Sequence, residues 1–125
     1  MACVIWFKHL KALAYLLTHG EVYTLRGRRK NCPNGRVIVR AGRYVSIMGS
    51  IEYVGVIDLN DPAQVSRLNN YVSKSGFSSV EEWVEAYKEL NGNRNPAHLY
   101  HVKLTSTPTI LLPETPGNAR GFRLA

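Results

Sequence analysis

Residues 20–44, GEVYTLRGRRKNCPNGRVIVRAGRY, contain the clearest signals of fold and function in this sequence. Strand-forming residues fill positions 22–26 and 36–40, and the loop between them holds the turn signal Pro33-Asn34-Gly35. We therefore predict two short strands joined by a turn-rich loop. The same stretch carries one acid, Glu21, and seven cations: Arg26, Arg28, Arg29, Lys30, Arg36, Arg40 and Arg43.

The positive charge is concentrated in the first part of the chain. Residues 1–50 contain nine Lys or Arg and one acid, residues 51–99 contain four and seven, and the whole chain carries a net charge of +7. Cations held close together repel one another unless an anionic partner relieves the repulsion. A nucleic acid backbone is an anion with closely repeated charges. The pattern therefore favours a nucleic-acid-binding surface over a face that only keeps the protein soluble.

Length and cysteine content limit the class of protein. A chain of 125 residues is enough for one domain with a single core. Cys3 and Cys32 cannot build a disulfide framework, and we expect free thiols in a reducing cytosol. The apolar N-terminal segment contains Lys8 and Lys11, lacks a cleavage site and is too short to span a bilayer. We expect a cytoplasmic protein without cofactor or membrane attachment.

Periodicity and capping signals predict the other elements. Apolar runs and alternating patterns predict strands at residues 4–7, 22–26, 36–40, 44–48, 51–58 and 98–104. Helical spacing of apolar residues predicts helices at residues 8–19, 63–73 and 79–91. Gly20 ends the first helix, Gly49 and Ser50 interrupt the sheet, and Gly55 indicates a bulge or a close approach of another backbone. Asp61 caps the second helix and Ser79 the third, where Glu82 completes a capping box.

This density of short strands predicts an α+β fold, in which a small β-barrel or strongly bent mixed sheet has flanking helices. We assign residues 1–104 to this single domain. Residues 105–125 lack periodicity and are expected to form an extended tail on or beside it, in which residues 109–112 have the composition of a short strand.

The later part of the chain carries two specific segments, GFSSVEEWVEAYKEL at residues 76–90 and HLYHVKL at residues 98–104. Together with the apolar first strand, the helix that ends in glycine, the T-x-R strand and the basic turn, they resemble an ASCH domain over about residues 4–104. ASCH domains belong to the PUA-like superfamily of small β-barrels flanked by helices. They are generally thought to bind RNA, so the resemblance implies a PUA-like barrel with an RNA-binding cleft.

The family motif is written GxKxxExR. Gly20 and Arg26 match it at a spacing one residue shorter, with Glu21 in the lysine position and Thr24 in the acid position. A small bacterial branch deacylates N-acetylated cytidine and carries K-x-x-T-x-R plus a glutamate on the later helix. Thr24 and Arg26 fit that pattern, whereas Glu21 cannot replace the lysine amine. The glutamate of that branch corresponds to Glu81 or Glu82.

The principal hypothesis is RNA binding, with or without a modified nucleotide, between the basic stretch and the helix that begins at Ser79. The predicted binding residues are Lys8, Thr24, Arg26, Arg28, Arg29, Lys30, Arg36, Arg40 and Arg43. Arginine suits phosphate because its planar fork donates paired hydrogen bonds. Candidate stacking aromatics are Tyr23, Tyr44, Tyr53 and Trp83, although core packing explains most such residues. Contacts to roughly four phosphates would give a log–log salt slope of about −3 to −4.

The alternative hypothesis is an amidohydrolase that acts on an N-acylated nucleoside such as acetylated cytidine. Thr24 would be its nucleophile and Glu82 its carboxylate, with Lys8 or Lys30 in place of the missing lysine. In the binding hypothesis Glu82 instead accepts a hydrogen bond from a base edge. A metal site is not expected, because His98 and His101 point to opposite faces of a strand.

Overall fold

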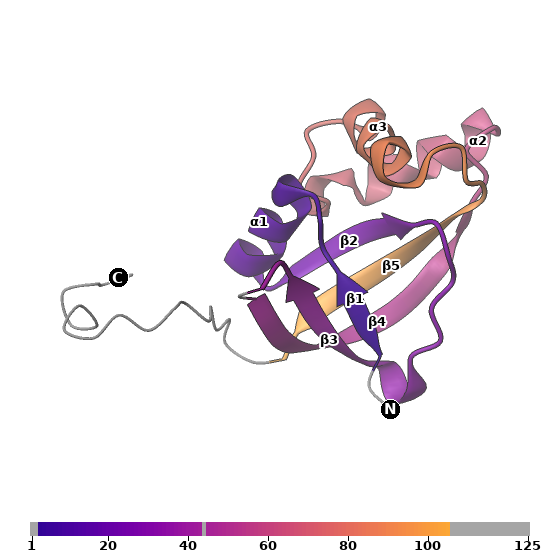
Figure 1. The fold of residues 1–125 in the computed structure, drawn as a ribbon. Coiled ribbons are helices and arrows are strands. Elements are labelled where there is room, and N and C mark those ends of the chain that lie inside the picture. The colour runs from indigo at the N-terminus through magenta and orange to yellow at the C-terminus, as the bar shows by residue number, and fades with distance from the viewer. Residues whose placement is uncertain (1–2, 44, 106–125) are drawn as a thin grey trace, which may run out of the picture.

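The computed structural model describes residues 3–43 and 45–105, which form a five-stranded mixed sheet with α1 beside it and α2 and α3 across one end (Figure 1). The strands are β1 (Val4–Trp6), β2 (Glu21–Arg26), β3 (Arg36–Ala41), β4 (Val45–Ile57) and β5 (Ala97–Leu104). The helices are α1 (Leu10–His19), α2 (Pro62–Ser66) and α3 (Val80–Asn91), with short 3-10 helices η1 (Pro33–Gly35), η2 (Arg67–Asn70) and η3 (Val72–Lys74). The α+β prediction is confirmed. Tyr44 and the proposed strand at residues 109–112 lie outside the described residues.

The strand order is β1-β3-β4-β5-β2, so the first two strands in sequence are the two edges of the sheet. β1 pairs in parallel with β3, and the other neighbours are antiparallel. Side chains connect the two edges: Arg26 Nη1 donates to the Trp6 carbonyl oxygen at 2.5 Å, and Lys30 Nζ donates to the Val4 carbonyl oxygen at 3.1 Å. No backbone ladder joins β1 to β2 within the described residues, so the sheet is bent but not closed.

Several local signals act as predicted. Gly20 ends α1 in the left-handed region with φ 79°, and its N–H donates to the Leu16 carbonyl oxygen at 2.8 Å. Asp61 caps α2 by accepting the Ala63 N–H at 3.0 Å, with Pro62 at the first helical position. The register of β4 against β5 shifts between Tyr53 and Gly55, which confirms the predicted bulge.

The predicted break at Gly49 and Ser50 is wrong, because β4 runs through both residues. A Cβ atom at Gly49 would lie 2.7 Å from the Lys103 carbonyl oxygen of β5. Glycine is therefore needed here for the close approach of two paired strands. A glycine inside a strand and a glycine that ends one look the same in the sequence.

The predicted helix at residues 63–73 is also wrong in extent, since α2 ends at Ser66 and η2 and η3 follow. Ser66 Oγ donates to the Ala63 carbonyl oxygen at 2.8 Å, and Asn69 Nδ2 donates to the Ser66 carbonyl oxygen at 2.9 Å. Such side-chain bonds compete with the backbone bonds that would continue an α-helix.

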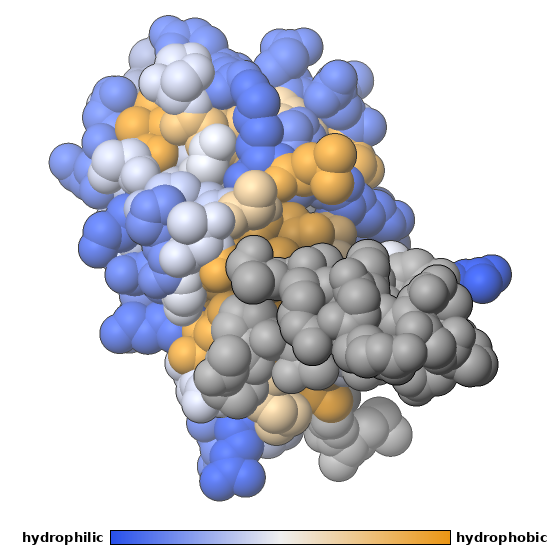
Figure 2. Space-filling model, turned by 90° about the vertical axis from the view of Figure 1, so that its left-hand side faces the viewer, coloured by the Kyte–Doolittle hydropathy of each residue, from blue (hydrophilic) through white to orange (hydrophobic). Residues whose placement is uncertain are grey.

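The core collects side chains from both sheet edges, from the inner strands and from α1, including the fully buried Ile5, Leu16, Val22 and Val102. Figure 2 views the side on which α1 lies and shows apolar side chains in a band between hydrophilic regions. Large apolar side chains that stay exposed in the described part are Trp6, Leu10, Met48, Val56 and Leu90. None of the helices formed by residues 3–43 and 45–105 is long and apolar enough to cross a membrane.

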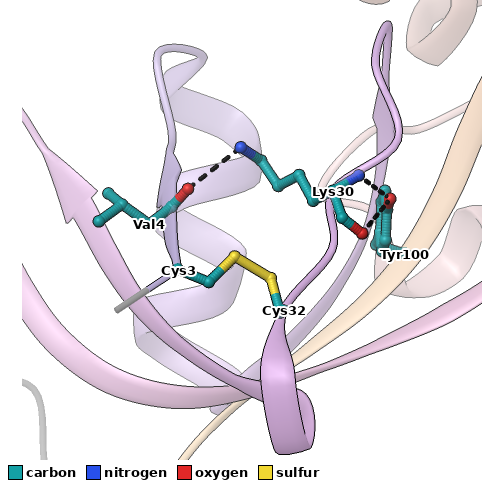
Figure 3. The surroundings of a disulfide bond; sticks show 5 residues. All are labelled: Cys3, Val4, Lys30, Cys32 and Tyr100. Carbon is teal, nitrogen blue, oxygen red and sulfur yellow. Dashed lines mark hydrogen bonds between the residues drawn. A yellow bond between two sulfur atoms is a disulfide. The ribbon is translucent and has the colours of Figure 1, made fainter. Parts of the chain in front are cut away.

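Cys3 and Cys32 form a disulfide, with their Cα atoms 5.3 Å apart, so the prediction of free thiols is wrong (Figure 3). The segment after β2 returns alongside the start of β1. Tyr100 Oη accepts the Lys30 N–H and also donates to the Lys30 carbonyl oxygen, which holds this segment in place. Two cysteines separated by 29 residues give no sign in the sequence that the fold brings them together.

Replacing both cysteines with serine should lower the free energy of unfolding by about 2–4 kcal/mol, because the disulfide restricts the unfolded chain. Urea titrations of the wild-type protein and of the Cys3→Ser/Cys32→Ser variant under non-reducing conditions measure this difference. Wild-type protein treated with dithiothreitol is the matched control and should unfold like the variant. Equal stability of the oxidised wild type and the variant would contradict the prediction.

Candidate functional site

A cavity of about 260 Å³ lies where the end of β1, the start of α1, the end of β2 and α3 meet. Six of its lining residues carry aromatic rings: Trp6, Phe7, His9, Phe77, Trp83 and Tyr87. Four are polar or charged, namely Lys8, Thr24, Arg26 and Asn91, and the aliphatic residues Ala12, Leu25, Ala86 and Leu90 complete the lining. The fold therefore brings together three of the residues predicted to bind nucleic acid, in the predicted place beside the helix that begins at Ser79.

Arg26 is partly buried at this cavity and is held by three neighbours. Its Nε donates to Thr24 Oγ1 at 3.1 Å, and its Nη1 donates to the Trp6 carbonyl oxygen. Its guanidinium carbon lies 4.6 Å from the centre of the Phe7 ring. A guanidinium has five N–H donors, so these contacts leave donors for a ligand.

No carboxylate offsets the charge of Arg26 in the described part of the chain. None of the ion pairs there includes Arg26, and no Asp or Glu lines the cavity. Burial lowers the pKa of Arg26 to about 10, so the guanidinium is poorly solvated but still protonated near neutral pH. An anionic or oxygen-rich ligand would supply the acceptors that water no longer provides.

A second hollow of about 330 Å³ adjoins the cavity and shares Arg26, Leu90 and Asn91 with it. Its other lining residues are Gly27, Arg28, Lys30 and Arg94. A Cβ atom at Gly27 would lie 2.6 Å from Arg94 Cδ, so glycine lets the segment after α3 approach β2. Arg94 was not among the predicted residues, because only this packing brings it beside the basic loop.

Arg29 and Lys30 lie on the same loop but have different roles. Lys30 binds the Val4 carbonyl oxygen and Tyr100, which makes it part of the fold, and burial followed by the nearby charge of Arg26 lowers its pKa. Arg29 places its guanidinium carbon 4.2 Å from the centre of the Tyr53 ring. Lys30 borders the second hollow, whereas Arg29 lines neither hollow.

Arg36, Arg40 and Arg43 are exposed and line neither hollow, so the structure does not gather all the predicted cations in one place. Arg36 and Arg40 project from β3, and Arg43 lies in the turn between β3 and β4. Arg40 stacks on Trp6, with its guanidinium carbon 5.2 Å from the ring centre.

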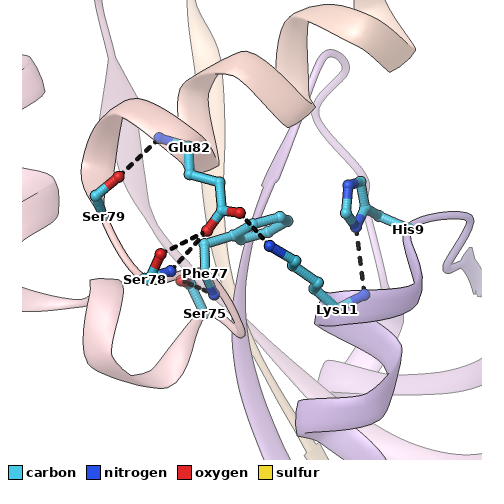
Figure 4. Close-up of polar contacts among 7 residues, drawn as sticks. All are labelled: His9, Lys11, Ser75, Phe77, Ser78, Ser79 and Glu82. Carbon is cyan, nitrogen blue, oxygen red and sulfur yellow. Dashed lines mark hydrogen bonds and ion pairs between the residues drawn. The ribbon is translucent and has the colours of Figure 1, made fainter.

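Glu82 is not among the residues that line the aromatic cavity. Figure 4 shows its carboxylate directed toward Ser78 and Lys11. One carboxylate oxygen accepts the Ser78 N–H at 2.8 Å and the Ser78 hydroxyl at 2.9 Å, and the other pairs with Lys11. Ser79 Oγ accepts the Glu82 N–H at 3.0 Å, so the predicted capping box forms, with its return contact at Ser78. Glu82 thus connects α3 to α1 and is committed to these partners.

Thr24 is buried, and among the described residues its hydroxyl is hydrogen-bonded to Arg26 and not to a general base, although Lys8 and His9 line the same cavity. No described Asp or Glu lines this cavity. Lys8 is the one lysine among the described lining residues of the cavity, whereas Lys30 is held at Val4. A nucleophilic threonine needs an adjacent base, so the arrangement suits ligand binding better than catalysis.

The aromatic residues predicted to stack on bases lie at different places in the fold. Trp83 lines the cavity, Tyr23 stacks on His101 with ring centres 4.3 Å apart, and Tyr53 lies under Arg29. His98 lies within hydrogen-bond distance of Tyr53 Oη, and burial, aided by the charge of Arg29, lowers its pKa. The described residues contain no cluster of three or more His, Cys, Asp or Glu that could hold a metal ion.

Comparisons with protein-family models, with curated proteins and with solved structures each give no match to this chain.

The contribution of Glu82 to stability should disappear in acid. Lys11, and after it the N–H and hydroxyl of Ser78, lower the pKa of Glu82 from 4.5 to about 2. A carboxyl whose pKa is depressed in the folded state stabilises the fold above its unfolded pKa, and loses that effect as the pH falls through its folded pKa. Glu82→Gln should therefore lower the melting temperature at neutral pH, by a small amount because the pair is exposed and screened by water.

That difference should vanish between about pH 4.5 and pH 2. Melting curves of both proteins across this range measure it, and Glu85→Gln on the same helix is the matched control. A Glu82→Gln difference that persists unchanged at the lowest pH would contradict the proposed cause.

Proposed function

We propose that this chain binds RNA, with one unstacked nucleotide in the aromatic cavity and its phosphate at the adjoining cationic hollow. The single observation that carries the proposal is Arg26, a partly buried guanidinium without a carboxylate partner in the described chain, positioned between the two hollows. A ligand that fills both hollows needs an aromatic or apolar part and an anionic part next to each other. A nucleotide has both.

The lining favours single-stranded RNA as the source of that nucleotide. Proteins read RNA mainly where bases are unstacked, by stacking them on aromatic rings and guanidinium planes. Phe7, Trp83 and Tyr87 provide such rings in the cavity that Arg26 lines. Thr24 and Asn91 provide polar groups that can form hydrogen bonds with a base edge. We propose this binding mode for unmodified and for modified bases.

The resemblance to ASCH domains supports the same assignment, and with it a PUA-like relationship for the bent sheet. Contacts of Arg26, Lys30 and the disulfide connect the two sheet edges, where a barrel would have a backbone ladder. The cytoplasm, where RNA is abundant, is part of the proposal. Disulfides are rare in a reducing cytosol, so the oxidation state of Cys3 and Cys32 in cells tests that location.

Hydrolysis of an N-acylated nucleoside is the second candidate, because Lys8 and Thr24 line the same cavity. Two observations favour binding over hydrolysis. Arg26 donates to the Thr24 hydroxyl, and no Asp or Glu is among the lining residues. Release of cytidine from N4-acetylcytidine by the wild-type protein, and its loss in Thr24→Val, would favour the enzyme.

Arg26→Met should weaken binding of a mixed-sequence single-stranded RNA of about ten nucleotides by roughly tenfold or more, because charge-assisted hydrogen bonds are lost. Arg67→Met removes the same charge from η2, outside both hollows, and should leave the affinity within about twofold of wild type. Fluorescence anisotropy measures the affinities, and circular dichroism confirms that each variant is folded.

Arg28→Ala tests the phosphate part of the site without disturbing Arg26. Arg28 is exposed and borders the second hollow, so its removal should lower the affinity and reduce the log–log salt slope by about 1. The proposal fails if wild-type protein binds no RNA at low salt, or if both Arg26→Met and Arg28→Ala leave its affinity unchanged.

A further inference from the structure

Alternate residues of β1, β3 and the first half of β4 point away from the core and form a continuous outer surface. Strand pairing places Trp6 beside Arg40, and Met48 beside Ile38. Arg36 lies on the same face, because residues two and four positions apart along a strand point to the same side. We call these five residues, Trp6, Arg36, Ile38, Arg40 and Met48, the outer strip.

The outer strip is accessible and not covered by a helix in the described structure. Trp6 is 44 % exposed and Met48 is 49 % exposed, and both arginines are exposed. The helices pack mainly against β2 and β5, on the other side of the strand order from β1 and β3. Two large apolar side chains therefore remain in water next to two cations.

The charge of the outer strip has one sign. β1 and β3 contain Arg36 and Arg40 but no acid, and β4 contains none before Glu52. Exposed Arg43, in the turn between β3 and β4, adds a third cation at the end of the strip. The nearest acid on this face is Glu52, two residues along β4 from Ser50, which pairs with Arg36. The cations outnumber it, and a surface with net positive charge is complementary to a polyanion.

Trp6 and Arg40 form the chemical centre of the outer strip. The Arg40 guanidinium carbon lies 5.2 Å from the centre of the Trp6 ring, which keeps the charge and the ring together at the surface. Arg36 and Arg40 are four residues apart on an extended strand, a distance of roughly 13 Å at about 3.3 Å per residue. This spacing suits several successive groups of an extended ligand better than one small anion.

The outer strip also borders the aromatic cavity, because Trp6 belongs to both. We propose that the outer strip is a second contact for the same single-stranded RNA, in which nucleotides flanking the one in the cavity stack on Trp6 and place phosphates at Arg40 and Arg36. This inference rests on the proposed function and extends it from one nucleotide to an extended strand.

Single-stranded RNA fits the outer strip better than a protein partner does. Trp and Arg are frequent in protein interfaces too, but such interfaces need an apolar centre with paired charges. Here Arg36, Ile38 and Arg40 alternate along β3, and no ion pair of the described residues includes either arginine. Aromatic rings beside a cationic track are the arrangement that binds single strands without strong sequence preference.

Binding of oligouridine of about four and of about twelve nucleotides tests the proposal, since only the longer one can occupy both sites. The wild-type protein should bind the longer RNA about tenfold more tightly than the shorter one. Arg36→Ala/Arg40→Ala should remove that advantage and change the affinity for the short RNA by less than about twofold. Arg67→Ala/Lys88→Ala removes the same charge from η2 and α3 and should keep the advantage of the longer RNA.

Failure of this inference is distinguishable from failure of the proposed function. If Arg26→Met weakens binding of both oligonucleotides but Arg36→Ala/Arg40→Ala behaves like the control variant, the outer strip is not an RNA contact. If only the Arg36→Ala/Arg40→Ala variant loses affinity, the strip binds RNA and the cavity does not. Sedimentation of the wild-type protein and of the Arg36→Ala/Arg40→Ala variant gives a further test. The inference is overturned if the wild type is a dimer, the variant is a monomer and both bind RNA equally well.

Discussion

The contacts of the Arg26 guanidinium connect the fold of this protein to its candidate site. Arg26 ends one edge strand, and its side chain donates to the backbone of the other edge strand at Trp6. The described sheet has no backbone ladder between these edges, and this bond, together with the disulfide and Lys30, connects them. The same group is partly desolvated and faces the aromatic cavity. The fold therefore fixes the position of the Arg26 guanidinium before a ligand binds, which lowers the conformational entropy lost on binding.

Two acids, Glu82 and Glu21, connect elements of the fold and form no described ion pair with the cations of the basic stretch. Glu82 pairs with Lys11 and bonds to Ser78, which ties α3 to α1. Glu21 is the one acid within the basic stretch. Its carboxylate is hydrogen-bonded to His101 on the neighbouring strand, and its Oε2 lies 3.6 Å from Lys74 Nζ. None of the ion pairs in the described structure includes Arg26 or the arginines of β3. The fold relieves their mutual repulsion by distributing them over the second hollow, the Tyr53 ring and the outer strip.

Elements that depend on local patterns could be predicted from the sequence. The apolar spacing of α1, its end at Gly20 and the Ser79 cap of α3 all form as expected, because each involves residues within a few positions of one another. Gly49 was misjudged because its role depends on Lys103, on a strand more than fifty positions later. The disulfide was missed for the same reason, since Cys3 and Cys32 meet only when the segment after β2 returns past β1.

By itself, the sequence determined that the chain is an α+β domain, that its positive charge lies in the first part, and that Thr24 and Arg26 share a strand face next to a basic loop. These properties follow from composition and from short-range periodicity. Only the tertiary structure decided which cations act together. Arg94 and Arg28 line the same hollow, and Lys30 has a structural role. Arg36 and Arg40 lie on another surface. The physical reason is that a bent sheet distributes neighbouring strand residues over separate surfaces, while close packing at Gly27 brings residues from distant segments into contact.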